Sequence, residues 1–110
     1  MSNIQRGVIT LLTATTSAVA SSSFMITQPG VLGAVKLKVT GLATTEKAYL
    51  QERDASGTFI NYEFNGSVPY FDLDGHIMLI NEPGEFRVNK DATASACAVT
   101  LIAPQDVVVY

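Results

Sequence analysis

Cysteine, histidine and tryptophan are almost absent from this chain of 110 residues, which has one cysteine, one histidine and no tryptophan. The single cysteine, Cys97, excludes an intrachain disulfide framework and a zinc site built on several cysteines. Nucleophilic catalysis of the Ser-His-Asp or Cys-His kind needs a base, so every such scheme would depend on His76. The sequence has no G-x-S-x-G elbow and no glycine-rich phosphate loop. We therefore expect a protein that is not an enzyme and that uses no cofactor.

Charged residues are also scarce. They make up 15% of the chain against 47% hydrophobic residues, and the net charge is -3. Nucleic-acid binding needs a basic face, which the seven scattered lysines and arginines do not predict. No apolar run approaches the roughly 18 residues of a membrane span. We therefore expect one folded domain that binds neither nucleic acid nor membrane.

The N-terminus imitates a secretory signal without matching one. The segment from Arg6 to Ala20 has a basic start, an apolar centre and an A-x-A ending. Its centre is interrupted by threonines, whereas a signal needs a continuous apolar stretch. We therefore predict that this segment stays on the chain.

Alternating apolar and polar residues predict β-strands through the middle of the chain, for example at 35–40 and 85–89, and a further strand is expected at 76–80. Pro104 is expected to break the pattern before a short terminal strand at 107–110. Turn signals separate the strands about every ten residues, as in β-sandwiches and small β-barrels. These signals are Asp54–Gly57, Asn65-Gly66, Asp72–Gly75 and Pro83-Gly84. The sequence predicts an all-β fold, an immunoglobulin-like β-sandwich of about 7–10 short strands with an extended N-terminal arm.

The two ends differ from the middle in charge. No charged residue lies between Arg6 and Lys36, and only Asp91 and Asp106 are charged after Lys90. We therefore divide the chain into an N-terminal arm, residues 1–34, and a sandwich core, residues 35–110. The arm could pack on its own domain or on a neighbouring molecule, and the sequence leaves both open.

Three short motifs suggest chemistry, and each has a simpler explanation. Asp72-x-Asp74-Gly75-His76 resembles the start of a calcium loop, but the later ligands are missing and a D-G hairpin turn explains it. Glu82 and Glu85 could form a glycosidase pair, yet they flank a Pro-Gly turn in a chain without tryptophan. Asn65-Gly66-Ser67 matches a glycosylation sequon, which the Asn-Gly turn also explains. We expect no metal site.

Apolar residues of the neutral ends and two out-of-phase aromatics are the candidates for contact with other proteins. Neutral segments can be buried without a charge-desolvation penalty, and an extended arm can add a strand to a neighbouring sheet. The candidate interface residues are Val8, Ile9, Leu11, Leu12, Phe24, Tyr49, Phe59, Val107, Val109 and Tyr110.

Three stretches of the chain resemble small β-sandwich virion proteins of tailed bacteriophages. The first is the Thr/Ala-rich opening at 8–24. The second, 35–57, has a strand ending in Thr-Gly and a D-x-S-G-type hairpin, and the third is Pro-Gly-Glu-Phe-Arg-Val at 83–88. Phe86 stands where many such domains have tyrosine, so the hydrogen bond of a tyrosine corner would be missing.

The resemblance implies a capsid decoration or cement protein, a homo-oligomer that docks on the major capsid protein or other virion proteins. Such a protein would be made in the host cytoplasm and located in the virion. A tail or head-fibre module that binds a host receptor or glycan is the alternative. Tyr49, Phe59 and Tyr70 would then be exposed near the binding loops.

Overall fold

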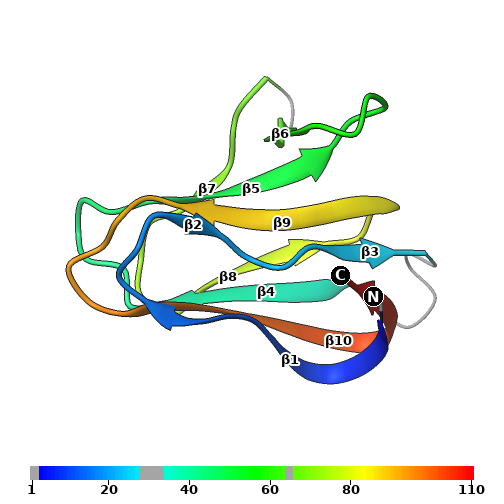
Figure 1. Cartoon of the computed structure of the whole chain (residues 1–110), viewed down its shortest axis with the longest axis horizontal. Helices are drawn as coiled ribbons and strands as arrows, with labels where there is room; N and C mark the ends of the chain where they lie inside the picture. Colours follow the sequence, from blue (N-terminus) through cyan, green and yellow to red (C-terminus); the bar gives the residue numbers. More distant parts are fainter. Residues whose placement is uncertain (1–2, 28–33, 64–65) are drawn as a thin grey trace.

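The computed structural model describes residues 3–27, 34–63 and 66–110, and all regular elements in them are β-strands (Figure 1). The all-β sandwich predicted from the sequence is confirmed. Asn65, and with it half of the predicted Asn65-Gly66 turn, lies outside the described residues. The strands are β1 (Asn3–Thr15), β2 (Val19–Ala20), β3 (Phe24–Ile26), β4 (Val35–Thr40), β5 (Ala48–Arg53), β6 (Phe59–Asn61), β7 (Tyr70–Phe71), β8 (His76–Ile80), β9 (Gly84–Lys90) and β10 (Cys97–Val109).

The strands form two layers that join along one side. Sheet 1 has the order β1-β10-β4-β8. In sheet 2, β2 and β3 pair with β9, β9 pairs with β5, and β5 pairs with β6 and β7. Phe24 of β3 lies opposite both Phe86 of β9 and Val109 of β10, so one antiparallel sheet curls into both layers. Figure 1 shows β5 and β9 on one side of the molecule and β4, β10 and β1 on the other.

The strand order refines the immunoglobulin-like part of the prediction. If β2 with β3 and β6 with β7 are each taken as one interrupted strand, the layers read 1-8-3-6 and 2-7-4-5. This is the order of a jelly roll. In an immunoglobulin domain the first two strands share a sheet. Side-chain alternation has the same period in both folds, so it could not distinguish them.

The N-terminal segment belongs to this domain's own sheet. β1 pairs with β10 from Asn3 opposite Val109 to Thr15 opposite Cys97. The radius of gyration is 13.1 Å, and a compact domain of this length is expected to have about 13 Å. Of the two placements that the sequence left open, the structure has β1 on its own domain, as an edge strand.

The predicted break at Pro104 is wrong, because β10 continues through it. Ala103 pairs with Gly7 and Val107 pairs with Gln5, so β10 has extra residues here and bulges. Pro104 lies in this bulge, where the ladder needs no N–H donor. Proline therefore bends the strand without ending it.

The core fills the space between the layers. Val35, Leu37 and Val39 of β4 are fully buried, as their alternation predicts. At one end, the side chain of Lys90 is also buried. Its Nζ donates hydrogen bonds to the carbonyl oxygens of Ser17 (2.7 Å) and Asp91 (3.1 Å) and to Thr93 Oγ1 (3.2 Å). These three acceptors match the three donors of the ammonium group, which offsets the cost of burying it.

Candidate interaction surface

The candidate interface residues fall into exposed, partly buried and buried groups, according to the side of the strand on which each side chain lies. Val8 is 76% exposed and Tyr110 is 48% exposed. Leu12, Tyr49 and Phe59 are partly buried. The remaining five are buried in the core of this domain: Ile9, Leu11, Phe24, Val107 and Val109. These five stabilise the sandwich and present no surface to a neighbour.

The outer face of sheet 1 carries much of the exposed apolar surface. Of the nine large hydrophobic side chains that are exposed in the described residues, three lie here: Val8, Ile77 and Leu79. Their exposed fractions run from 47% to 76%. The strand register places Val8 beside Ile102 and, beyond β4, Leu79 on β8, so the four strands form one surface. An exposed apolar patch of this kind typically marks a protein contact site.

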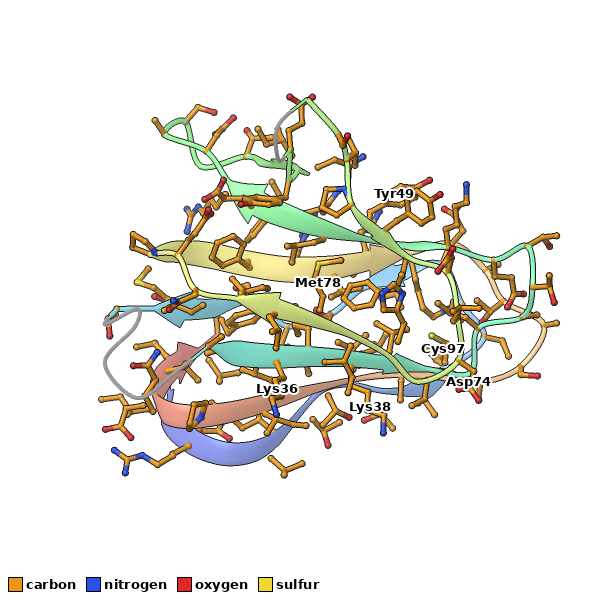
Figure 2. All side chains as sticks on the ribbon, turned by 180° about the vertical axis from the view of Figure 1, so that it is seen from behind. Lys36, Lys38, Tyr49, Asp74, Met78 and Cys97 are labelled. Atoms are coloured by element: carbon orange, nitrogen blue, oxygen red, sulfur yellow. The ribbon has the colours of Figure 1, made fainter. Side chains whose placement is uncertain are left out.

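Two lysines lie within this apolar surface. Lys36 is opposite both Ile102 and Leu79, and Lys38 is one row along, opposite Ile77 (Figure 2). Among the described residues, no carboxylate lies within ion-pair distance of either lysine. The outer face of sheet 1 is therefore apolar with an unpaired positive charge.

An exposed ion pair lies at the margin of this face, next to the β10 bulge. Arg6 Nε is 2.9 Å from Asp106 Oδ1, and both side chains are more than half exposed. Solvent screens such pairs, so this one adds little stability.

The outer face of sheet 2 is polar and aromatic. Tyr49 lies opposite Tyr70, with ring centroids 6.0 Å apart, and Lys47 Nζ is 4.4 Å from the Tyr70 ring centre. Arg87 covers the ring of Phe59 at 4.2 Å. These cations occupy part of the aromatic surface. The two outer faces of the sandwich thus differ in chemistry.

A groove of about 420 Å³ lies between β8 and the β5–β7 region. Its floor is apolar, with Leu50, Met78 and Ile80 among the lining residues (Met78 in Figure 2). At its rim, the Tyr62 hydroxyl donates a 2.7 Å hydrogen bond to Glu82 Oε2. A neighbouring hollow shares Tyr62 and adds Glu52 and Glu63 to the lining.

The groove has a negative electrostatic character. Burial, the hydrogen bond to Glu82 and the charges of Glu82 and Glu52 raise the pKa of Tyr62 to about 12. Burial, and then the charge of Glu82, raises the pKa of Glu52 above its usual value. The two hollows are lined by three carboxylates and, among the described residues, by no lysine or arginine. The groove therefore favours a group that is apolar along its length and positive at its end.

The sequence reasoning missed Ile4, Ile77 and Leu79 and the groove. Residues 76–80 are nearly all apolar, so the outward-facing Ile77 and Leu79 were visible as apolar residues on both sides of one strand. The groove brings together β5, the segment after β6 and β8, which are distant in sequence. No local pattern in the sequence could reveal it.

The residues considered for catalysis and metal binding contact neighbouring residues of turns and of the core. His76 Nδ1 is 3.4 Å from Asp72 Oδ1, while Asp74 Oδ1 accepts a 2.7 Å hydrogen bond from the backbone N–H of Gly41. Cys97 is buried, and burial raises the pKa of its thiol. Within the described ranges, no group of three or more His, Cys, Asp or Glu side chains gathers as a metal site would require. No helix in the described part of the chain is long and apolar enough to cross a membrane.

Comparison with known proteins identifies a related fold. No family model and no curated protein sequence matches the chain. Among solved structures, the crystal structure of the SPBc2 prophage-derived protein YomS matches with a TM-score of 0.58 and 14% sequence identity. The match covers 100% of this chain and 96% of that one. At this identity the likeness establishes a shared fold over the full length of the domain.

Proposed function

We propose that this chain is a non-enzymatic structural protein of a tailed-phage particle, a decoration or cement protein that docks on neighbouring subunits. The observation that carries the proposal is the outer face of sheet 1, where Val8, Ile77 and Leu79 are exposed. Burying such a face against a partner gains about 25 cal/mol per Å² of apolar area. A protein repeated over a lattice adds that gain at every copy.

Two further observations support a phage origin. The structural neighbour is a prophage-derived protein, and its likeness extends over the whole chain. The jelly roll is also a fold of viral capsid domains, which is an argument by analogy of fold. The N-terminal contribution to docking is now limited to the outward side chains of β1, chiefly Ile4 and Val8, because the alternate positions are in the core.

The test uses particles from the strain that encodes the chain. Particles are purified by density gradient after induction, and their proteins are quantified by mass spectrometry against the particle-free lysate. The proposal expects the chain in the particle band at a fixed ratio to the major capsid protein. Its recovery only in the particle-free fraction would refute the proposal.

A fibre module that binds a receptor or glycan is the second candidate. It is supported by Tyr49, Tyr70 and Phe59, which lie on the outer face of sheet 2 beside Lys47 and Arg87. A glycan array probed with the wild-type chain and with Tyr70→Ala tests it. Binding that Tyr70→Ala removes would favour this second candidate, and an array without binding would remove its support.

A further inference from the structure

The groove and the outer face of sheet 1 are complementary surfaces on the same chain. We infer that the chain assembles head to tail, with the lysine-bearing outer face of sheet 1 in one copy covering the Tyr62 groove of the next. This inference deepens the proposed function, since it names a second copy of the chain as one partner of that face.

The groove requires a specific kind of partner. Its floor, formed by Leu50, Met78 and Ile80, offers apolar contact over a hollow of about 420 Å³. Burial, and then the nearby charge of Glu82, raises the pKa of Glu52. A positive group placed between them would relieve this repulsion. A lysine meets both demands, because its methylene stem is apolar and its ammonium group is charged.

The outer face of sheet 1 supplies such lysines. Lys36 is flanked by Ile102 and Leu79, and Lys38 is flanked by Thr100 and Ile77, so each lysine stands beside an apolar side chain of β8. Neither lysine has a carboxylate within ion-pair distance among the described residues. The unpaired positive charge of this face and the unpaired negative charge of the groove would compensate each other across a contact.

The charge pattern also disfavours a symmetric pair of identical faces. Placing two outer faces together would bring the lysines of both copies into one interface, where like charges repel. Placing two grooves together would do the same with carboxylates. Contact between unlike surfaces is heterologous, and it produces a closed ring or an open filament. Leu79 belongs to the outer face and also lines the groove, so the two surfaces meet at β8.

The first experiment measures the mass of the full chain in solution by light scattering after size exclusion, at several concentrations. The wild type is expected at twice the chain mass of 11.7 kDa or at a higher multiple of it. Lys36→Glu/Lys38→Glu and Glu52→Lys/Glu82→Lys should each raise the dissociation constant by about tenfold or more, because like charges then face each other. The variant with all four changes restores opposite charges and should recover the assembly. Lys47→Glu/Asp91→Lys, which alters a lysine and an acid outside both surfaces, is the matched control and should assemble as the wild type does.

The second experiment needs no variant, so it holds even if a charge reversal impairs folding. A carbodiimide joins an amine directly to a carboxylate in ionic contact. Applied to a mixture of ¹⁴N- and ¹⁵N-labelled wild type, it should give mixed-isotope peptides joining Lys36 or Lys38 to Glu52, Glu63 or Glu82. A monomer at all concentrations, or an oligomer cross-linked only at other sites, would overturn the inference. A monomer that is nevertheless found on particles would overturn this inference alone, whereas an assembled chain absent from particles would overturn only the proposed function.

Discussion

At the scale of single residues, Gly41 shows how the backbone restricts the sequence. Its φ of +93° lies in the left-handed region, and a Cβ at this position would collide with the carbonyl oxygen of Ala96. Gly7 has a similar φ of +94° but open space around it. The pair therefore separates two costs, the strain of the conformation and the collision.

We predict that Gly41→Ala destabilises the fold by about 3 kcal/mol or more, while Gly7→Ala costs about 1–2 kcal/mol. The difference arises because the Ala96 backbone would have to move. Urea denaturation of both variants measures it. Equal destabilisation in the two variants would show that the collision is relieved without cost.

Tyr62 gives a prediction about alkaline pH. Its pKa is raised from 10.0 to about 12, so the native state holds the phenol proton more tightly than the unfolded state does. The stabilisation is complete below pH 10 and is lost as the pH rises from 10 towards 12. When thermal unfolding is measured at increasing pH from 9.5, the melting temperature should fall more steeply for the wild type than for Tyr62→Phe. Parallel curves would show that Tyr62 ionises as in the unfolded chain.

The residue types in the sequence indicated which chemical groups the chain carries, but only the structure shows what surrounds each group. The scarcity of histidine and cysteine predicted a chain without catalytic groups, and that stays a prediction. Cys97 alternates in phase with Val99 and Leu101 along the sequence, and all three side chains are buried. The Tyr62–Glu82 hydrogen bond joins residues from opposite sides of the groove. Local sequence carries no signal of such a contact.

At the scale of strands, the alternation of apolar and polar residues predicted where the strands lie better than it predicted which strands pair. Residues 35–40 and 76–80 are strands as expected, and Asp54–Gly57 is a turn in which Asp54 Oδ1 accepts hydrogen bonds from the N–H groups of Ser56 and Thr58. Pairing was not predictable, since the strand next to β10 in sheet 1 is the first in the chain. Such long-range pairing depends on packing of the whole domain, which a period of two residues does not encode.

β1 offers a test of its double role as core strand and docking surface. Ile9 is 5% exposed and its neighbour Val8 is 76% exposed. We expect Ile9→Ala to lower the unfolding free energy by about 2–4 kcal/mol and Val8→Ala to change it by less than about 0.5 kcal/mol. Chemical denaturation of both variants measures this. If Ile9→Ala unfolds at the same denaturant concentration as wild type, β1 is not part of the folded core.

At the scale of the whole molecule, the sandwich presents two unlike faces. The outer face of sheet 1 is apolar with Lys36 and Lys38, and the outer face of sheet 2 is polar with cation-covered aromatic rings. The charge pattern predicted contacts with other proteins, because the uncharged ends of the chain can be buried without a charge-desolvation penalty. The fold decides which face does so, since the strand register sorts the apolar side chains between inside and outside.

The most direct test of the docking account replaces apolar residues of the outer face of sheet 1 while leaving the core intact. Val8→Lys/Leu79→Lys changes two side chains that are 76% and 63% exposed, and Val19→Lys, at 37% exposure on β2, is the control outside that face. Each variant is expressed in place of the wild type, and its copies per purified particle are counted by mass spectrometry. We predict that Val19→Lys is retained at the wild-type level and that the double variant is folded but reduced at least about tenfold, because two charges would be buried on docking. A folded double variant present at wild-type copy number would contradict the account.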